Sequence, residues 1–89
     1  MLDYKLLKAL AAVIDERGFE KAAEVLNISQ SAVSQRIRLL EDQLGTILLI
    51  RATPPSTTEA GSKLLSHFRK VSILEQDLDQ SLQPDLSKY

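Results

Sequence analysis

Residues Lys21 to Glu41 read KAAEVLNISQSAVSQRIRLLE and contain the clearest structural pattern of the chain. Alanines and a leucine recur at helical spacing in the first part of this stretch and predict a short helix from about Glu20 to Leu26. Asn27-Ile28-Ser29 then breaks the pattern, since asparagine tolerates a left-handed backbone and Ser29 can cap the next helix. The stretch therefore predicts two helices joined by a three-residue turn, with Ile28 plugging the core between them.

The second helix of this pair is predicted to run from Gln30 to Leu44 and to end at Gly45. Its apolar residues recur at steps of four, three and four and predict one buried stripe: Val33, Ile37, Leu40 and Leu44. The opposite face carries small hydrogen-bonding side chains near the helix start and a basic one further along. This exposed set is Gln30 at the tip, Ser31, Ser34 on the flank, Gln35 and Arg38.

Such a face has the chemistry that reads base edges in the major groove of duplex DNA. A glutamine can form two hydrogen bonds to adenine, and a serine can donate or accept one. Taken singly, Ser31, Ser34 and Gln35 fit a solvated polar surface as well; their place on the second helix of a tight pair favours base reading. Arg38 can swing to the DNA backbone, whereas Arg36 leans towards the core flank and either pairs with an acid or contacts phosphate.

Outside this pair, Tyr4 to Glu16 has helical spacing and is predicted to stop at Arg17-Gly18, with the glycine left-handed. Downstream, Leu48 to Ile50 predicts a short strand, and a return strand is expected near Ser56-Thr57. Between them, Thr53 to Ser56 contains two prolines that favour an extended loop. A two-stranded wing therefore follows the helix pair.

Arg51 stands at the start of this wing, and residues 52–57 add no other base. An arginine on a projecting loop can enter a narrow minor groove, with an ordinary surface position as the alternative. Thr57 can donate its hydroxyl to a phosphate, whereas helix capping fully accounts for Thr58.

A long helix is predicted from Thr58 to about Leu82, ahead of Pro84. Its first half can pack on the domain, but its second half extends beyond so small a body and would expose apolar side chains in a monomer. Pairing with the same helix of a second copy is the simplest way to bury these apolar side chains. The alternative is that they form an aggregation-prone end, created because the chain is a fragment of a longer protein. The predicted dimer contacts are Val71, Leu74, Leu78 and Leu82.

Composition excludes several classes of protein. The 89 residues fit one small domain, no apolar run is long enough for a membrane span, and the N-terminus lacks the pattern of a signal peptide. The absence of cysteine excludes disulfides and thiolate metal sites and favours a cytoplasmic location. The net charge of −1 hides a +3 segment from Arg17 to Lys70.

The ingredients of an active site are missing as well. His67 is the single histidine and is expected on the surface of the long helix. The sequence has no glycine-rich phosphate loop and no acid cluster with ligand spacing. We therefore expect no catalysis, no metal and no cofactor.

Blocks spread along the chain carry a family resemblance: Gly18–Leu26, Ser29–Glu41, Leu44-Gly45, Leu48-Leu49, Arg51 and Thr58–Gly61. In this order and spacing they resemble the N-terminal domain of LysR-type transcriptional regulators over nearly the whole chain. The resemblance implies a mainly α fold, a winged helix-turn-helix with a short two-stranded wing and a long C-terminal linker helix. It also implies homodimers on imperfect inverted repeats of DNA, with base contact by Gln30, Ser31, Ser34 and Gln35 and backbone or minor-groove contact by Arg38 and Arg51.

Some positions differ from the commonest pattern of the family, which has Pro where Ser31 stands and Arg-Gln where Gln35-Arg36 stands. These variants, Arg17–Glu20 and Pro54-Pro55 resemble the arginine- and lysine-responsive subgroup that controls export of basic amino acids. Family members continue into a ligand-sensing domain, which this chain lacks. The expected division is therefore a DNA-binding domain (1–57), a linker and dimerisation helix (58–83) and a tail towards the effector domain (84–89).

A protein-interaction module is the alternative, in which the long helix dimerises and the helix pair binds a protein. Such a site would need aromatic or apolar anchors on the exposed face of residues 30–38, and that face has none. The sequence therefore predicts a sequence-specific duplex-DNA-binding domain of a bacterial transcription regulator.

Overall fold

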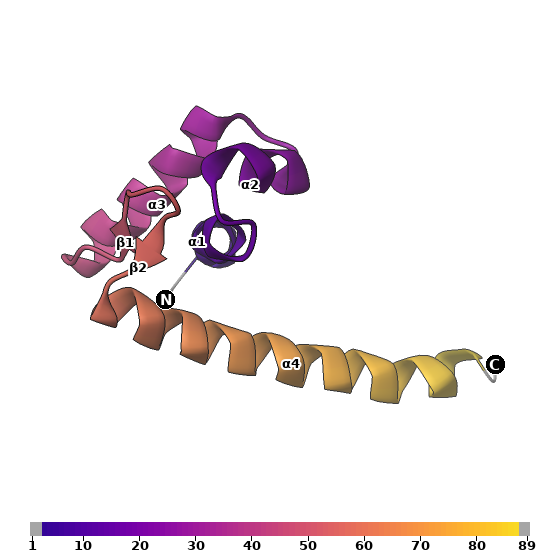
Figure 1. Ribbon diagram of the computed structural model, residues 1–89. Coiled ribbons are helices and arrows are strands. Elements are labelled where there is room, and N and C mark those ends of the chain that lie inside the picture. Colours follow the sequence, from indigo (N-terminus) through magenta and orange to yellow (C-terminus); the bar gives the residue numbers. More distant parts are fainter. Residues whose placement is uncertain (1–2, 88–89) are drawn as a thin grey trace.

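The computed structural model describes the backbone of residues 3–87 and the side chains of residues 3–78. Within this part the chain forms four helices and one antiparallel pair of strands. In order these are α1 (Tyr4–Asp15), α2 (Phe19–Leu26), α3 (Gln30–Leu44), β1 (Leu49–Ile50), β2 (Ser56–Thr57) and α4 (Glu59–Ser87). Figure 1 shows α1–α3 gathered into a body, with the strands beside α3 and α4 running past them.

Each of the first three helices is followed within two residues by a left-handed residue. These residues are Arg17, Asn27 and Gly45, with φ of 61°, 59° and 66°. In α1 the following N–H, that of Gly18, donates back to the Val13 carbonyl at 3.1 Å. The left-handed position predicted for Gly18 is therefore wrong, because Gly18 supplies the returning N–H and the residue before it must turn. Gly18 itself is extended and begins α2.

The core lies between α1, α3 and the start of the wing. Its largest fully buried side chains are Leu10, Val13, Val33, Ile37, Leu40 and Leu48. Helix α2 contributes Ala22 and Ala23, which are small enough to let it pack closely on this core. The buried stripe of α3 departs from prediction at its end: Leu44 is 40% exposed, and the buried residue there is Glu41. The reason is that the Glu41 carboxylate accepts hydrogen bonds from the wing backbone.

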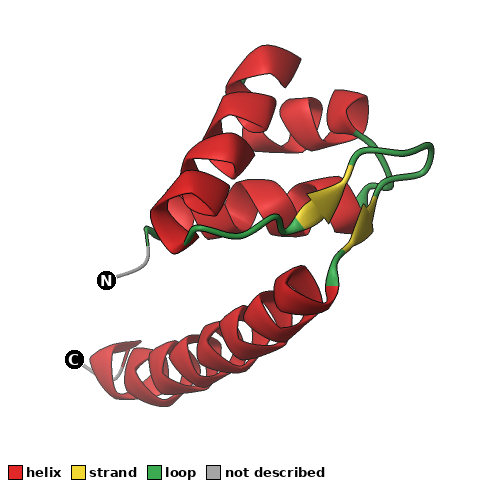
Figure 2. Cartoon of the chain, turned by 90° about the vertical axis from the view of Figure 1, so that its left-hand side faces the viewer, coloured by secondary structure: helices red, strands yellow, loops and turns green. Residues whose placement is uncertain are grey.

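The wing pairs Leu49 with Thr57 and Ile50 with Ser56. Its connecting loop bends at residues 52–54 instead of staying extended, because the chain must reverse direction for the strands to pair. The Thr53–Pro54 peptide is cis. Figure 2 shows this hairpin at the edge of the molecule, between the helical body and α4.

The first half of α4 packs on the body. Leu65 and Phe68 are buried, and a Cβ at Gly61 would overlap the carbonyl oxygen of Leu48. Thr58 caps the helix, because its hydroxyl accepts from the Gly61 N–H at 3.1 Å and donates to the Ile47 carbonyl at 2.7 Å. The absence of a side chain at Gly61 therefore lets α4 cross the base of the wing at backbone contact.

Two polar contacts and one ring contact hold α4 against α1. Arg69 donates to both carboxylate oxygens of Asp15, at 2.7 and 3.3 Å. The Tyr4 hydroxyl donates to Glu75 at 3.0 Å, and its ring lies 5.5 Å from that of Phe68. We call these four residues and Phe68 the α1–α4 strap.

Helix α4 does not stop where predicted. It continues past Leu82 and Pro84 to Ser87. Proline already has a helical φ and removes one backbone hydrogen bond, so it does not by itself end a helix. The Leu82 side chain, one of the predicted dimer contacts, lies outside the described residues. The predicted division into residues 1–57, 58–83 and 84–89 stays a prediction.

Candidate nucleic-acid interface

The outer face of α3 presents the side chains predicted to read bases. Gln30, Ser31, Gln35 and Arg38 are exposed, and Ser34 is half-buried on the flank. Ser29 caps the helix by accepting from the Ala32 N–H at 3.1 Å, and its hydroxyl lies 3.3 Å from that of Ser31. The start of α3, residues 30–35, therefore presents an uncharged hydrogen-bonding surface.

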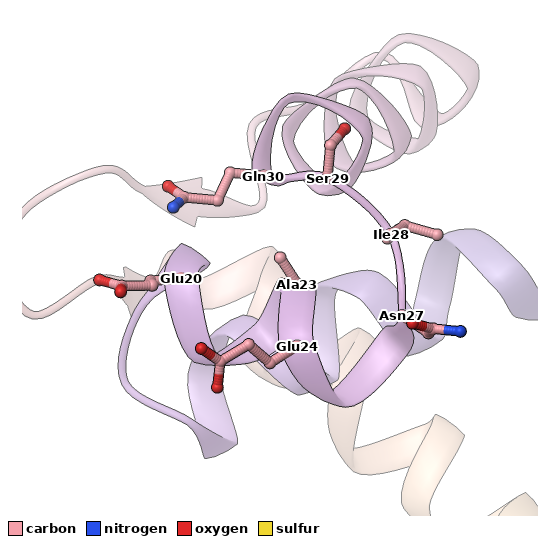
Figure 3. A pocket seen from close by; sticks show the side chains of 7 residues that line it. All are labelled: Glu20, Ala23, Glu24, Asn27, Ile28, Ser29 and Gln30. Carbon is pink, nitrogen blue, oxygen red and sulfur yellow. The ribbon is translucent and has the colours of Figure 1, made fainter.

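Beside this surface lies an open groove between α2 and the start of α3. Figure 3 shows Gln30, Glu20 and Glu24 extending to the same side of it. The two carboxylates are exposed and close to the helix tip, where they oppose the approach of phosphate. The α2 side of this groove is thus acidic, while the α3 side contributes uncharged polar groups.

Two basic side chains, Arg36 and Arg38, lie further along α3. Arg38 is exposed and Arg36 half-buried, and neither forms an ion pair with the described side chains. Pairing with an acid, one of the two roles considered for Arg36, is therefore absent from this part of the structure. Both guanidinium groups are available to an anion.

Arg51 differs from these two, because it turns back onto the body. Its Nη1 donates to Ser34 Oγ at 2.8 Å, and its Nη2 lies 4.0 Å from Glu41 Oε1. The guanidinium carbon also lies 5.4 Å from the centre of the Phe19 ring. The structure thus brings together two predicted site residues, Arg51 and Ser34, that stand 17 positions apart in the sequence.

Sequence reasoning missed two residues of this group. Glu41 is 8% exposed, and its Oε2 accepts from the N–H groups of Leu48 at 2.8 Å and Leu49 at 3.2 Å. The only local hint was an acid beside the apolar stripe of α3. For Phe19 the sequence gave no signal beyond an aromatic residue directly after Gly18. Their partners lie too far along the chain for a periodic pattern to reveal them.

The remaining predicted contacts are placed as follows. The hydroxyl of Thr57 is hydrogen-bonded with that of Ser62 at the root of α4. On α4 itself Val71 is half-buried, whereas Leu74 and Leu78 are 67% and 58% exposed. Ile73, which was not among the predicted dimer contacts, is 57% exposed as well. The outer part of α4 therefore carries uncovered apolar side chains, as predicted.

The described part of the chain offers no group of three or more His, Cys, Asp or Glu side chains that could hold a metal ion. His67 is exposed on α4. No helix among the residues searched is long and apolar enough to cross a membrane.

A tight helix pair with a two-stranded wing is also what comparison with known proteins finds. The model of the bacterial regulatory helix-turn-helix protein, lysR family, matches residues 4–62. The chain belongs to the LysR family.

Within that family, the chain is 59% identical over 88 residues to the HTH-type transcriptional regulator ArgP of Pseudomonas fluorescens. The match covers 99% of this chain and 29% of ArgP, so the chain spans under a third of that relative's length. Its relatives are transcriptional regulators, which are not enzymes. The resemblance to the LysR family and to its arginine-responsive subgroup is confirmed at this level.

Two solved structures place the fold. Full-length LTTR LysG from Corynebacterium glutamicum has a TM-score of 0.91 at 37% identity, over 100% of this chain and 31% of LysG. LysG has also been solved with bound effector Arg. The DNA-binding domain of BenM, in complex with catB site 1 DNA, has a TM-score of 0.79 at 31% identity, over 92% of this chain and 93% of that one. The predicted fold class, a mainly α winged helix, is confirmed.

Proposed function

We propose that this chain binds duplex DNA sequence-specifically, with α3 in the major groove and the wing beside the minor groove. The carrying observation is the outer face of α3. It has uncharged hydrogen-bonding side chains at its start and, further on, arginines that form no ion pair with the described side chains, while Val33, Ile37 and Leu40 are fully buried behind it. This arrangement holds base-reading groups rigidly on a helix that can enter the groove. Similarity to the DNA-bound BenM domain supports the same conclusion.

In this proposal the side chains divide into two roles. Gln30, Ser31, Ser34 and Gln35 contact base edges, while Arg36, Arg38 and Thr57 contact the backbone. The net charge of only +3 over residues 17–70 makes a single copy a poor binder, so we also propose a homodimer on an inverted repeat. The exposed leucines of α4 supply its interface.

The effector of the whole regulator is proposed from the relatives. A basic amino acid would act through a domain outside this chain, by similarity to LysG with bound Arg and to ArgP. The proposed place of action is the cytoplasm, where this cysteine-free chain would meet DNA.

The salt dependence of binding tests the proposal. If each subunit makes roughly three to five phosphate contacts, the dimer should show a log–log slope of about −5 to −9 on its preferred duplex. That duplex is obtained by sequencing the bound fraction of a random-core duplex library. A slope near zero would refute DNA binding.

Base reading is tested by a matched pair of glutamines on α3. Gln35→Ala should cost about 1–3 kcal/mol at particular base pairs and leave binding to random-core duplex almost unchanged. Gln43→Ala, two turns further along and also exposed, is the control and should change no base preference. Equal loss on every duplex from Gln35→Ala would place the reading face elsewhere.

A further inference from the structure

Arg51 is the wing arginine that the sequence assigned to the minor groove, yet its side chain is occupied within the protein. We infer that Arg51 is a positioning residue that orients the Ser34 hydroxyl for base selection and makes no contact with DNA itself. This inference rests on the proposed DNA-binding function and names a determinant of its specificity.

Three groups hold the guanidinium in place. The Ser34 hydroxyl accepts from Nη1 at 2.8 Å, the Glu41 carboxylate faces Nη2 at 4.0 Å, and the Phe19 ring lies below at 5.4 Å. They come from α3 and from the start of α2, so Arg51 joins the wing to both helices. The side chain is only 30% exposed. Reaching out to a groove would break all three contacts at once.

Glu41 makes this position difficult to abandon. Its other carboxylate oxygen is bound to two backbone N–H groups of the wing, and its side chain is buried. It therefore cannot follow Arg51 outward. Withdrawal of the guanidinium would leave a buried carboxylate without its cation, which is unfavourable. Arg36 and Arg38 carry no such restraint, and they are the arginines free to contact phosphate.

The bond to Ser34 has a chemical consequence for base selection. A serine hydroxyl has one proton to donate and two lone pairs to accept with. When the charged Nη1–H occupies a lone pair, the hydroxyl proton points away from Arg51, and donation becomes the favoured outward role. Ser34 should then prefer base edges that present acceptors, such as guanine O6 and N7 or thymine O4. Cytosine, which offers only its N4 amino donor in the major groove, should be disfavoured at that position.

The first test compares matched arginines by salt slope on the duplex selected by the unsubstituted chain. Arg51→Gln should leave the slope unchanged, because no counterion is released at Arg51. Arg38→Gln is the control and should make the slope shallower by about 1.8 for a dimer, one phosphate contact per subunit. An equally shallow slope for Arg51→Gln would overturn the inference. A flat slope in the unsubstituted chain would instead refute the proposed function, so the two failures are distinct.

The second test reads base preference from sequencing of the bound random-core library. Arg51→Lys keeps the charge but loses the planar guanidinium that donates several hydrogen bonds at once. It should weaken the base preference about tenfold at one position per half-site, the same position that Ser34→Ala affects. The double variant should lose nothing further, because Arg51 acts through Ser34. Losses at different positions, or additive losses, would overturn the inference.

Glu41→Gln guards against a trivial folding effect. The amide oxygen can still accept from the Leu48 and Leu49 N–H groups, but the charge facing Arg51 is removed. With the circular dichroism spectrum unchanged, the base preference should relax at the position that Ser34→Ala affects. An unaltered preference in a folded Glu41→Gln protein would count against Arg51 being held by this carboxylate.

Discussion

Two consecutive segments of α4 both carry apolar side chains, but their surroundings are opposite. In the root segment, residues 59–70, Leu65 and Phe68 are 5% and 8% exposed. In the outer segment, residues 71–78, Leu74 and Leu78 are 67% and 58% exposed. The body beside the root segment makes the difference, and it ends near the strap. An apolar stripe thus predicts that a helix face is buried. The tertiary structure shows which part of that face is buried by the same chain and which part is left for a second chain.

The largest effect is expected in the outer segment. Leu78→Asp would place two unpaired carboxylates across the proposed two-fold interface, at a cost of about 3–5 kcal/mol or more in dimer stability. Ultracentrifugation should show that the variant is a monomer, and circular dichroism should show that it is folded. Its affinity for the preferred duplex should fall steeply. Gln76→Asp, at another exposed position of the same segment, is the control and should sediment unchanged. A Leu78→Asp protein that still sediments as a dimer would locate the interface elsewhere.

In the root segment the expected loss is in the fold of the single chain. Phe68→Ala removes a buried ring and should lower the free energy of unfolding by about 3 kcal/mol. Leu74→Ala, at an exposed position, should change it by less than about 0.5 kcal/mol when the chain is dilute enough to be monomeric. Urea titrations at low protein concentration give both values. Similar losses for the two variants would erase the distinction between the segments.

A smaller effect is expected at the boundary between the segments. Arg69→Ala removes the bond to Asp15, and since both side chains are about half exposed, the loss of stability should be about 0.5 kcal/mol. Addition of salt should reduce the difference between the variant and the parent chain. A loss of about 2 kcal/mol or more, four times the expected value, would mean that the strap acts as part of the core.

The smallest effect depends on pH. Desolvation beside Phe68 and the hydrogen bond to Glu75 raise the pKa of the Tyr4 phenol above its ordinary 10.0. Since the folded-state pKa is the higher one, this contribution to stability is complete below pH 10.0 and is lost as the pH rises through the folded-state value. The tyrosinate absorbance of the chain, compared with that of Tyr4→Phe, should show the delayed titration. A titration midpoint for Tyr4 at or below pH 10.0 would show that the hydrogen bond between Tyr4 and Glu75 does not persist in solution.

The parts of the fold that sequence predicted well are those whose signals lie in neighbouring residues. The bounds of α3 were predicted as observed, because Ser29 caps its start and Gly45 ends it. The turn between α2 and α3 followed from Asn27, which is left-handed as expected. Exposure of Ser31, Gln35 and Arg38 followed from the helical period, while their contact with DNA remains a proposal.

What sequence could not show is set by contacts between distant residues. Tyr4 and Glu75 are 71 positions apart, and Arg69 and Asp15 are 54 apart, so no local pattern links them. The same holds for Arg51, whose partners Ser34, Glu41 and Phe19 lie too far along the chain for a local pattern to link them. For a related reason Leu44 is exposed and Glu41 buried, the reverse of what their side chains suggest. A helical period predicts one buried face, but it does not predict a carboxylate that accepts hydrogen bonds from the wing backbone.

The length of α4 turns its attachment angle into a lever. At 1.5 Å per residue, its 29 residues span about 43 Å. A tilt of about 5° at the root would move the far end by about 4 Å, close to the rise of one base-pair step. In the proposed dimer, a small change in the angle at which α4 leaves the body would therefore change the separation of the two α3 helices by several ångströms. The strap residues Tyr4 and Arg69, whose contacts add little to stability, would in this way govern which spacing of half-sites the protein accepts.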